Sequence, residues 1–117
     1  MAQNEDGASR AGLSDDDVRA LVARLPGAEE GAHHGHPDFR VGGRIFATLW
    51  PPTHSANVRI AAEDADALAR MEPDVYRLIS DRGGYGWLGV DLSRVAETEL
   101  ARLLEGAWRL RAPAPRS

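Results

Sequence analysis

The glycine pair at positions 42 and 43 constrains the fold of this chain more than any other feature. It separates two strand-forming runs, residues 36–41 and 44–50. A two-residue Gly-Gly connection between such runs favours a type I′ β-turn, because both central residues of that turn need positive φ. The sequence therefore predicts a tight β-hairpin whose register is set by its turn.

The register of this hairpin predicts which side chains share a face of the sheet. Counting away from the turn gives three cross-strand pairs: Val41 with Arg44, Arg40 with Ile45, and Phe39 with Phe46. Successive side chains along a strand point to opposite faces. We expect the core face to carry Phe39, Val41 and Phe46, and the opposite face to carry Arg40, Ile45, Ala47 and Leu49.

Helical and strand patterns flank the hairpin on both sides. Ser14 offers an N-cap, with Asp17 in the capping-box position, which predicts a helix over residues 14–25. The other expected elements are a third strand over 57–60, a helix over 63–72, a short segment of undecided type over 75–79, a strand over 85–92 and a closing helix over 96–110. This order predicts an α+β fold with an antiparallel sheet and helices on one side.

The length of 117 residues predicts a single domain. We expect it to span residues 13–112, between a disordered leader (1–12) and a frayed tail (113–117), because both ends lack apolar periodicity. No run of about eighteen apolar residues occurs, so we expect no membrane segment. The absence of cysteine excludes thiolate catalysis and cysteine-ligated metals, and it favours a reducing cytoplasm.

The charge of the chain limits the ligands that it can bind. Its fourteen basic residues are all arginines, and eighteen carboxylates bring the net charge to −4. This balance excludes a polyanion binder that relies on bulk positive charge. Any nucleic-acid site must therefore be a local patch of arginines.

Several segments, in their order and content, resemble a known family. The string LPGAEEGAHHGHPDFRVGGRIFATLWP is followed by an acidic short helix, by GWLGVDL and by an ELARLLEGAWRL helix. The most specific matches are the Leu25-Pro26 helix exit, the Gly35-x-Pro37 turn, the hairpin from Phe39 to Ala47, Gly86-Trp87 and Ala107-Trp108. In these features the chain closely resembles the MmcQ/YjbR-like family of small bacterial proteins over residues 14–112.

This resemblance implies a two-layer α-β(3)-α-β(2)-α fold, similar to that of secretion chaperones, and a "double wing" association that suggests DNA binding. The family usually has a lysine after the hairpin glycine, where this chain has Arg44, so positive charge is kept at the wing tip. We expect the binding residues to lie at this tip and on the sheet face away from the helices: Arg40, Arg44, Arg59 and Trp87.

A histidine-rich loop before the hairpin is an alternative candidate site. Nitrogen and oxygen ligands for zinc or nickel could come from Glu30, His33, His34 and His36. The HExxH spacing that fixes two histidines on one helical face is absent, and the resembling family varies at these positions. We therefore expect an exposed polar loop with no metal, no cofactor and no catalytic residue.

Three classes of function follow from these observations. The first is a non-enzymatic module that binds DNA weakly and in a salt-sensitive manner through its hairpin wings. The second is a chaperone-like module that binds a protein, a peptide or a second copy of the chain on its open sheet face. The third is a metal-dependent enzyme that uses the histidine loop. We predict the first.

Overall fold

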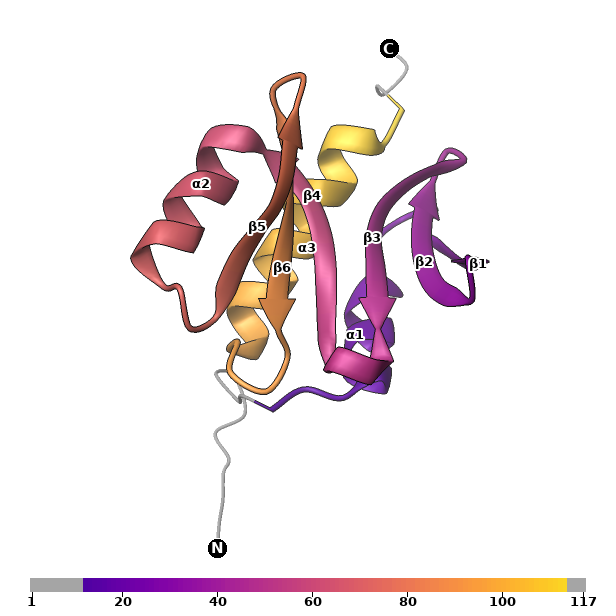
Figure 1. The fold of residues 1–117 in the computed structure, drawn as a ribbon. Coiled ribbons are helices and arrows are strands. Elements are labelled where there is room, and N and C mark those ends of the chain that lie inside the picture. The colour runs from indigo at the N-terminus through magenta and orange to yellow at the C-terminus, as the bar shows by residue number, and fades with distance from the viewer. Residues whose placement is uncertain (1–11, 114–117) are drawn as a thin grey trace, which may run out of the picture.

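The computed structural model describes residues 12–113 and shows a sheet covered by helices (Figure 1). The elements are α1 (Asp15–Val22), β1 (Glu29–His33), β2 (His36–Val41), β3 (Arg44–Trp50), a 3₁₀ turn (Pro51–Thr53), β4 (Ser55–Ala61), α2 (Ala62–Met71), β5 (Tyr76–Arg82), β6 (Tyr85–Asp91) and α3 (Glu97–Arg111). The predicted leader and tail lie outside the described residues, apart from Gly12 and Pro113.

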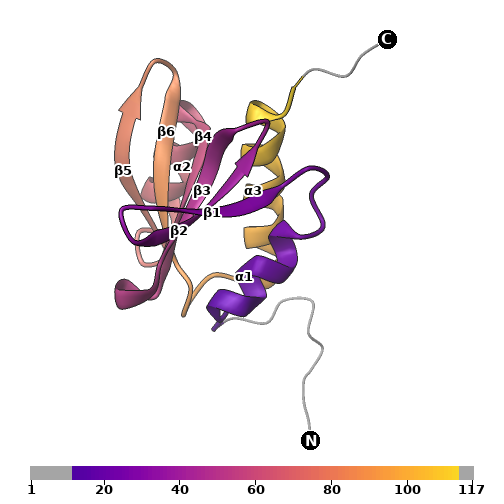
Figure 2. The same cartoon turned by 90° about the vertical axis from the view of Figure 1, so that its right-hand side faces the viewer.

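The six strands form one antiparallel sheet in the order β1-β2-β3-β4-β6-β5. Helix α3 packs on β3 and β4, α2 packs on β5 and β6, and α1 packs against α3. Figure 2 shows the helices on the same side of the sheet. The predicted α+β fold with helices on one side is therefore confirmed. No helix within residues 12–113 has the length and apolar character needed to cross a membrane.

The histidine-rich segment forms a strand where the sequence predicted a loop. Strand β1 pairs with β2 from Glu29 opposite Arg40 to His33 opposite His36. The two residues between these strands, His34 and Gly35, both have positive φ, 53° and 80°. They form a second two-residue hairpin turn, so four strands precede α2 instead of the predicted three. The signal was missed because His-Gly is not one of the usual two-residue hairpin pairs, which are Asn-Gly, Asp-Gly and Gly-Gly.

The Gly42-Gly43 turn has the predicted conformation, with φ of 59° and 79°, but the predicted register holds for only the first two pairs. Val41 lies opposite Arg44 and Arg40 opposite Ile45, and then a bulge moves Phe39 opposite Ala47 instead of Phe46. One extra residue in a strand exchanges the faces of everything beyond it. Ala47 and Leu49, which we expected on the open face, are therefore buried in the core.

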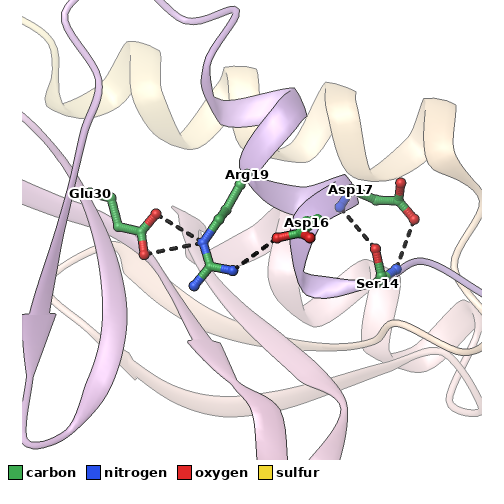
Figure 3. Close-up of polar contacts among 5 residues, drawn as sticks. All are labelled: Ser14, Asp16, Asp17, Arg19 and Glu30. Carbon is green, nitrogen blue, oxygen red and sulfur yellow. Dashed lines mark hydrogen bonds and ion pairs between the residues drawn. The ribbon is translucent and has the colours of Figure 1, made fainter.

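Helix α1 begins with the predicted capping box. Ser14 Oγ accepts a hydrogen bond from the Asp17 amide at 3.1 Å, and the Asp17 carboxylate accepts one from the Ser14 amide at 2.8 Å (Figure 3). The helix ends at Val22, before the predicted end. The amides of Arg24 and Leu25 bond carbonyls three residues back, which tightens the last turn.

The remaining predictions agree with the structure to within a few residues. The third strand is longer than expected, the undecided segment is strand β5, and α2, β6 and α3 lie where the sequence placed them. The core fills the space between the helices and the sheet. Its largest fully buried side chains are Phe39, Phe46, Leu13, Leu49, Leu88, Leu92, Leu100 and Leu104.

Candidate nucleic-acid interface on the open sheet face

The open face of the sheet is built from alternate residues of its central strands. In the β4–β6 ladder, Val58 and Leu88 form a pair that is buried under the helices. The next pair along the ladder, Arg59 and Trp87, points to the opposite face, and both residues are half-buried. The structure therefore brings these two predicted residues side by side.

A hollow of about 340 Å³ lies on this face, next to the Arg59–Trp87 pair. Its lining residues come from β4, β5 and β6: Arg59, Ser80, Arg82, Tyr85 and Trp87. The Arg59 guanidinium lies 3.9 Å from the centre of the Tyr85 ring. This cation–π contact orients Arg59 without neutralising its charge. The hollow thus combines aromatic surface with free positive charge.

The arginines of the described chain fall into two groups. Those that pair with a carboxylate are Arg19, Arg40, Arg70, Arg94, Arg102 and Arg109. Within residues 12–113, no carboxylate pairs with Arg24, Arg44, Arg59, Arg77, Arg82 or Arg111. All of this second group except Arg24 lie on β3, β4 or β5, or contact β3 from the end of α3. The unpaired arginines are therefore concentrated on the sheet and at the end of α3, while four of the six paired arginines, Arg19, Arg70, Arg102 and Arg109, lie on helices.

Two of these unpaired arginines stand beside the hairpin tips. Arg44 follows the Gly42-Gly43 turn of the β2–β3 hairpin, and Arg82 precedes the Gly83-Gly84 turn of the β5–β6 hairpin. Figure 1 shows both tips at the same end of the molecule. Arg44 is exposed, so its guanidinium can reach a ligand.

Arg40, the fourth predicted binding residue, is already engaged within the protein. Its Nε donates to Asp38 Oδ1 at 2.8 Å and its Nη2 donates to Asp38 Oδ2 at 3.0 Å. These hydrogen bonds hold the pKa of the buried Asp38 carboxyl below its usual value. A charge that is paired in this way offers little to a phosphate, and the binding role of Arg40 stays a prediction.

A second aromatic patch on the open face was missed by sequence reasoning. The rings of His36 and Trp50 are 3.8 Å apart between centroids and tilted by 33°. Trp50 Nε1 also donates to Thr48 Oγ1 at 3.0 Å. The predicted register put Thr48 and Trp50 on the core face, and the bulge in β3 turns them outward. A bulge has no reliable sequence signature, so only the structure reveals this patch.

The chain matches the model of a known protein family. The family model described as YjbR matches residues 23–110, which is most of the chain. This chain belongs to the YjbR family. The resemblance to MmcQ/YjbR-like proteins that the sequence suggested is therefore confirmed.

The fold of this YjbR-family chain is shared by a solved protein. The crystal structure of Deinococcus radiodurans protein DR2400, with domain DUF419, superposes with a TM-score of 0.75 at 21% sequence identity. The match covers 87% of this chain and 80% of the other. At this identity the likeness shows a common fold. A comparison with curated proteins finds no match.

In this YjbR-family chain the four candidate metal ligands have different surroundings. Glu30 accepts hydrogen bonds from Arg19 of α1 at 2.9 and 3.2 Å (Figure 3). His36 stacks on Trp50, whereas His33 and His34 lie exposed with their ring centroids 4.1 Å apart. Residues 12–113 contain no group of three or more potential ligands that could hold a metal ion. The enzyme alternative therefore gains no support from the geometry.

Proposed function

We propose that this protein binds single-stranded nucleic acid on the open face of its sheet. Bases stack on Trp87 and Tyr85, and the backbone phosphates contact the unpaired arginines, chiefly Arg44, Arg59 and Arg82. The observation that carries this proposal is the hollow in which aromatic rings and uncompensated guanidinium groups stand together. Stacking of bases on aromatic side chains, combined with a positively charged track, is the general means of holding single strands.

The face suits an unpaired strand better than a duplex. Stacking platforms need bases that are splayed out of a helix, and bases within a duplex are already stacked on one another. A net charge of −4 also limits the number of phosphates that the protein can contact. The hairpin tips with Arg44 and Arg82 can then guide the two ends of a bound strand.

The location of the apolar surface argues against peptide binding on this face. A largely apolar hollow of about 480 Å³ lies between α2 and α3 on the other side of the sheet. A chaperone-like site needs extended aliphatic surface. Among residues 12–113, the large aliphatic side chains on the open face are half-buried Ile45 and exposed Ile79.

Titration with a short oligothymidylate and with a duplex of equal length tests the proposal. At about 20 mM salt, where exposed charges are poorly screened, we expect the single strand to bind more tightly. The slope of log affinity against log salt should be about −2 to −4 for a few phosphate contacts. Trp87→Ala should weaken binding without changing this slope, whereas Arg59→Gln should weaken binding and reduce it.

Arg102→Gln is the matched control, because Arg102 lies on α3 and pairs with Glu99. This variant should bind like the wild type. Absence of binding at low salt, or equal effects of Arg102→Gln and Arg59→Gln, would contradict the proposal. Saturable binding of an apolar peptide that Trp87→Ala abolishes would favour the protein-binding alternative.

A further inference from the structure

A second hollow, of about 280 Å³, lies beyond Trp87 on the open face of the sheet. Its lining includes Ser55 and Asn57 of β4, Arg77 of β5 and Gly89 of β6. In the two ladders of β6, Gly89 lies opposite both Asn57 and Arg77. Because side chains alternate along a strand, Gly89 shares its face with Trp87, two residues away. The two hollows therefore follow one another along β6.

Gly89 forms the floor of the second hollow, because it has no side chain. A Cβ atom at this position would lie 3.0 Å from Ile79 Cδ1 and 3.5 Å from Asn57 Oδ1. Ile79 is the extra residue of a bulge in β5, and the tip of its side chain borders the floor. A glycine inside a strand is often the place where a ligand approaches the backbone closely. The exposed peptide plane of Gly89 offers a flat surface to a planar ring.

Two groups of opposite charge stand at the rim of this hollow. Arg77 and Asp74, which belongs to the turn after α2, both line it, and both are exposed. Within residues 12–113, neither side chain makes a hydrogen bond or an ion pair. The other lining carboxylate, Asp91, is already engaged, because its Oδ1 accepts from the Ser93 amide at 2.9 Å and from Ser93 Oγ at 2.6 Å. The hollow thus presents one guanidinium fork and one carboxylate to a ligand.

We infer that this hollow is a subsite for one guanine base. Guanine carries two neighbouring acceptors, O6 and N7, and an arginine fork donates to both of them. On another edge it carries two neighbouring donors, N1–H and the N2 amino group, which the two oxygens of a carboxylate can accept. The other common bases lack such a pair of neighbouring donor groups. Arg77 then donates to O6 and N7, and Asp74 accepts from N1–H and N2.

The inference rests on the proposed function, in which the guanine belongs to the bound single strand. Trp87 and Gly89 are two residues apart on β6, so their positions differ by about 7 Å. Stacked bases of a helix are separated by only about 3.4 Å. A strand stretched along β6 can therefore place one base on Trp87 and the neighbouring base in the hollow over Gly89.

The test compares oligothymidylate with the same oligomer carrying one central guanine, hypoxanthine or 7-deazaguanine. We expect the guanine to tighten binding about tenfold, because it adds a bidentate contact. Hypoxanthine lacks the N2 amino group and 7-deazaguanine lacks N7, so each should lose part of this gain. Arg77→Gln should abolish the difference between guanine and 7-deazaguanine, and Asp74→Asn that between guanine and hypoxanthine. Each variant removes the partner of the altered atom.

Two matched controls should keep the preference for guanine. Arg24→Gln removes another exposed, unpaired arginine that lies away from the sheet, and Gly106→Ala adds a methyl group on α3, where no atom lies within 4 Å. In contrast, Gly89→Ala should reduce the preference, because its methyl group fills the floor of the hollow. Oligothymidylate should bind this variant like the wild type.

The outcomes separate the subsite from the proposed function. If oligothymidylate binds but guanine brings no gain, or if the gain survives in both Arg77→Gln and Asp74→Asn, the subsite is overturned and the proposed function stands. If guanosine alone shifts the NMR amide signals of Gly89 and Arg77, but no oligonucleotide binds more tightly than guanosine, the site stands and the proposed function fails. Should Gly89→Ala unfold the protein, the variants of the exposed Arg77 and Asp74 decide.

Discussion

Asp38 and Arg40, two residues apart on β2, form a doubly hydrogen-bonded ion pair in which the Asp38 side chain is fully buried and that of Arg40 is 38% exposed. Gly31 of the neighbouring strand makes room for the pair. A Cβ atom at that position would lie 3.0 Å from Asp38 Oδ1 and 3.3 Å from Arg40 Nε. The pair therefore depends on the β1–β2 hairpin as well as on β2.

Removing either partner of this ion pair should have unequal effects. Arg40→Met leaves a buried carboxylate without a counter-ion and should lower the free energy of unfolding by about 3 kcal/mol at pH 7. Asp38→Asn leaves a partly exposed guanidinium that water can solvate, so its cost should be smaller. Urea unfolding of both variants measures the difference. Equal losses would contradict the buried environment of Asp38.

The same pair should make stability depend on acid pH. The pKa of Asp38 is lowered in the folded state, so its contribution is present above its unfolded pKa of about 3.9 and is lost as pH falls through the folded pKa. Asp38→Asn should flatten this part of the curve of unfolding free energy against pH. If the unfolding free energy of the variant falls as steeply at acid pH as that of the wild type, other carboxylates cause the fall.

The neighbours Trp87 and Leu88 should respond in opposite ways, because they lie on opposite faces of β6. Leu88 is fully buried, and Leu88→Ala should cost about 2–5 kcal/mol. Trp87→Ala should cost less than about 1.5 kcal/mol while weakening oligothymidylate binding. Thermal unfolding and binding assays of the two variants provide the comparison. A loss of about 3 kcal/mol from Trp87→Ala would mark Trp87 as core.

The bulge in β3 can be tested at Leu49 and Ile45. Without the bulge both side chains would share the open face, but Leu49 is fully buried whereas Ile45 is half-buried. Leu49→Ala should therefore lower the free energy of unfolding by about 2–5 kcal/mol, and Ile45→Ala by clearly less. Similar, small losses of unfolding free energy in both variants would favour a β2–β3 register without the bulge.

Tyr76 should limit stability at alkaline pH. Burial raises its pKa to about 12, with smaller contributions from the charges of Glu99 and Glu72. Because the unfolded pKa is about 10, its contribution is complete below that pH and is lost as pH rises toward about 12. Unfolding free energies across this range should fall less steeply in Tyr76→Phe. Identical slopes in the wild type and the variant would show that folding does not raise the pKa of Tyr76.

The sequence by itself determined those features that depend on neighbouring residues. The Gly42-Gly43 turn, the capping box of Ser14 and the closing helix follow from local backbone preferences, and the structure shows each of them. Alternation of polar and apolar residues likewise placed Arg59 and Trp87 on one face, because β4 and β6 pair without interruption. For these features, local backbone preferences and the uninterrupted alternation of side chains along the strands were sufficient for the prediction.

Only the tertiary structure decided the features that depend on distant residues. The bulge exchanges the faces on which the side chains of β3 lie from Ala47 onward. It is stabilised by the packing of both Phe46 and Ala47 under the helices. Which arginines are free also depends on tertiary contacts: Arg19 of α1 is neutralised by Glu30 of β1, whereas within residues 12–113 Arg111 of α3 meets only the carbonyl of Ile45 on β3. The sequence specifies whether a side chain is charged, but the partner of that charge depends on which strands lie beside it. The reason is that Coulomb energy and desolvation depend on distance in space.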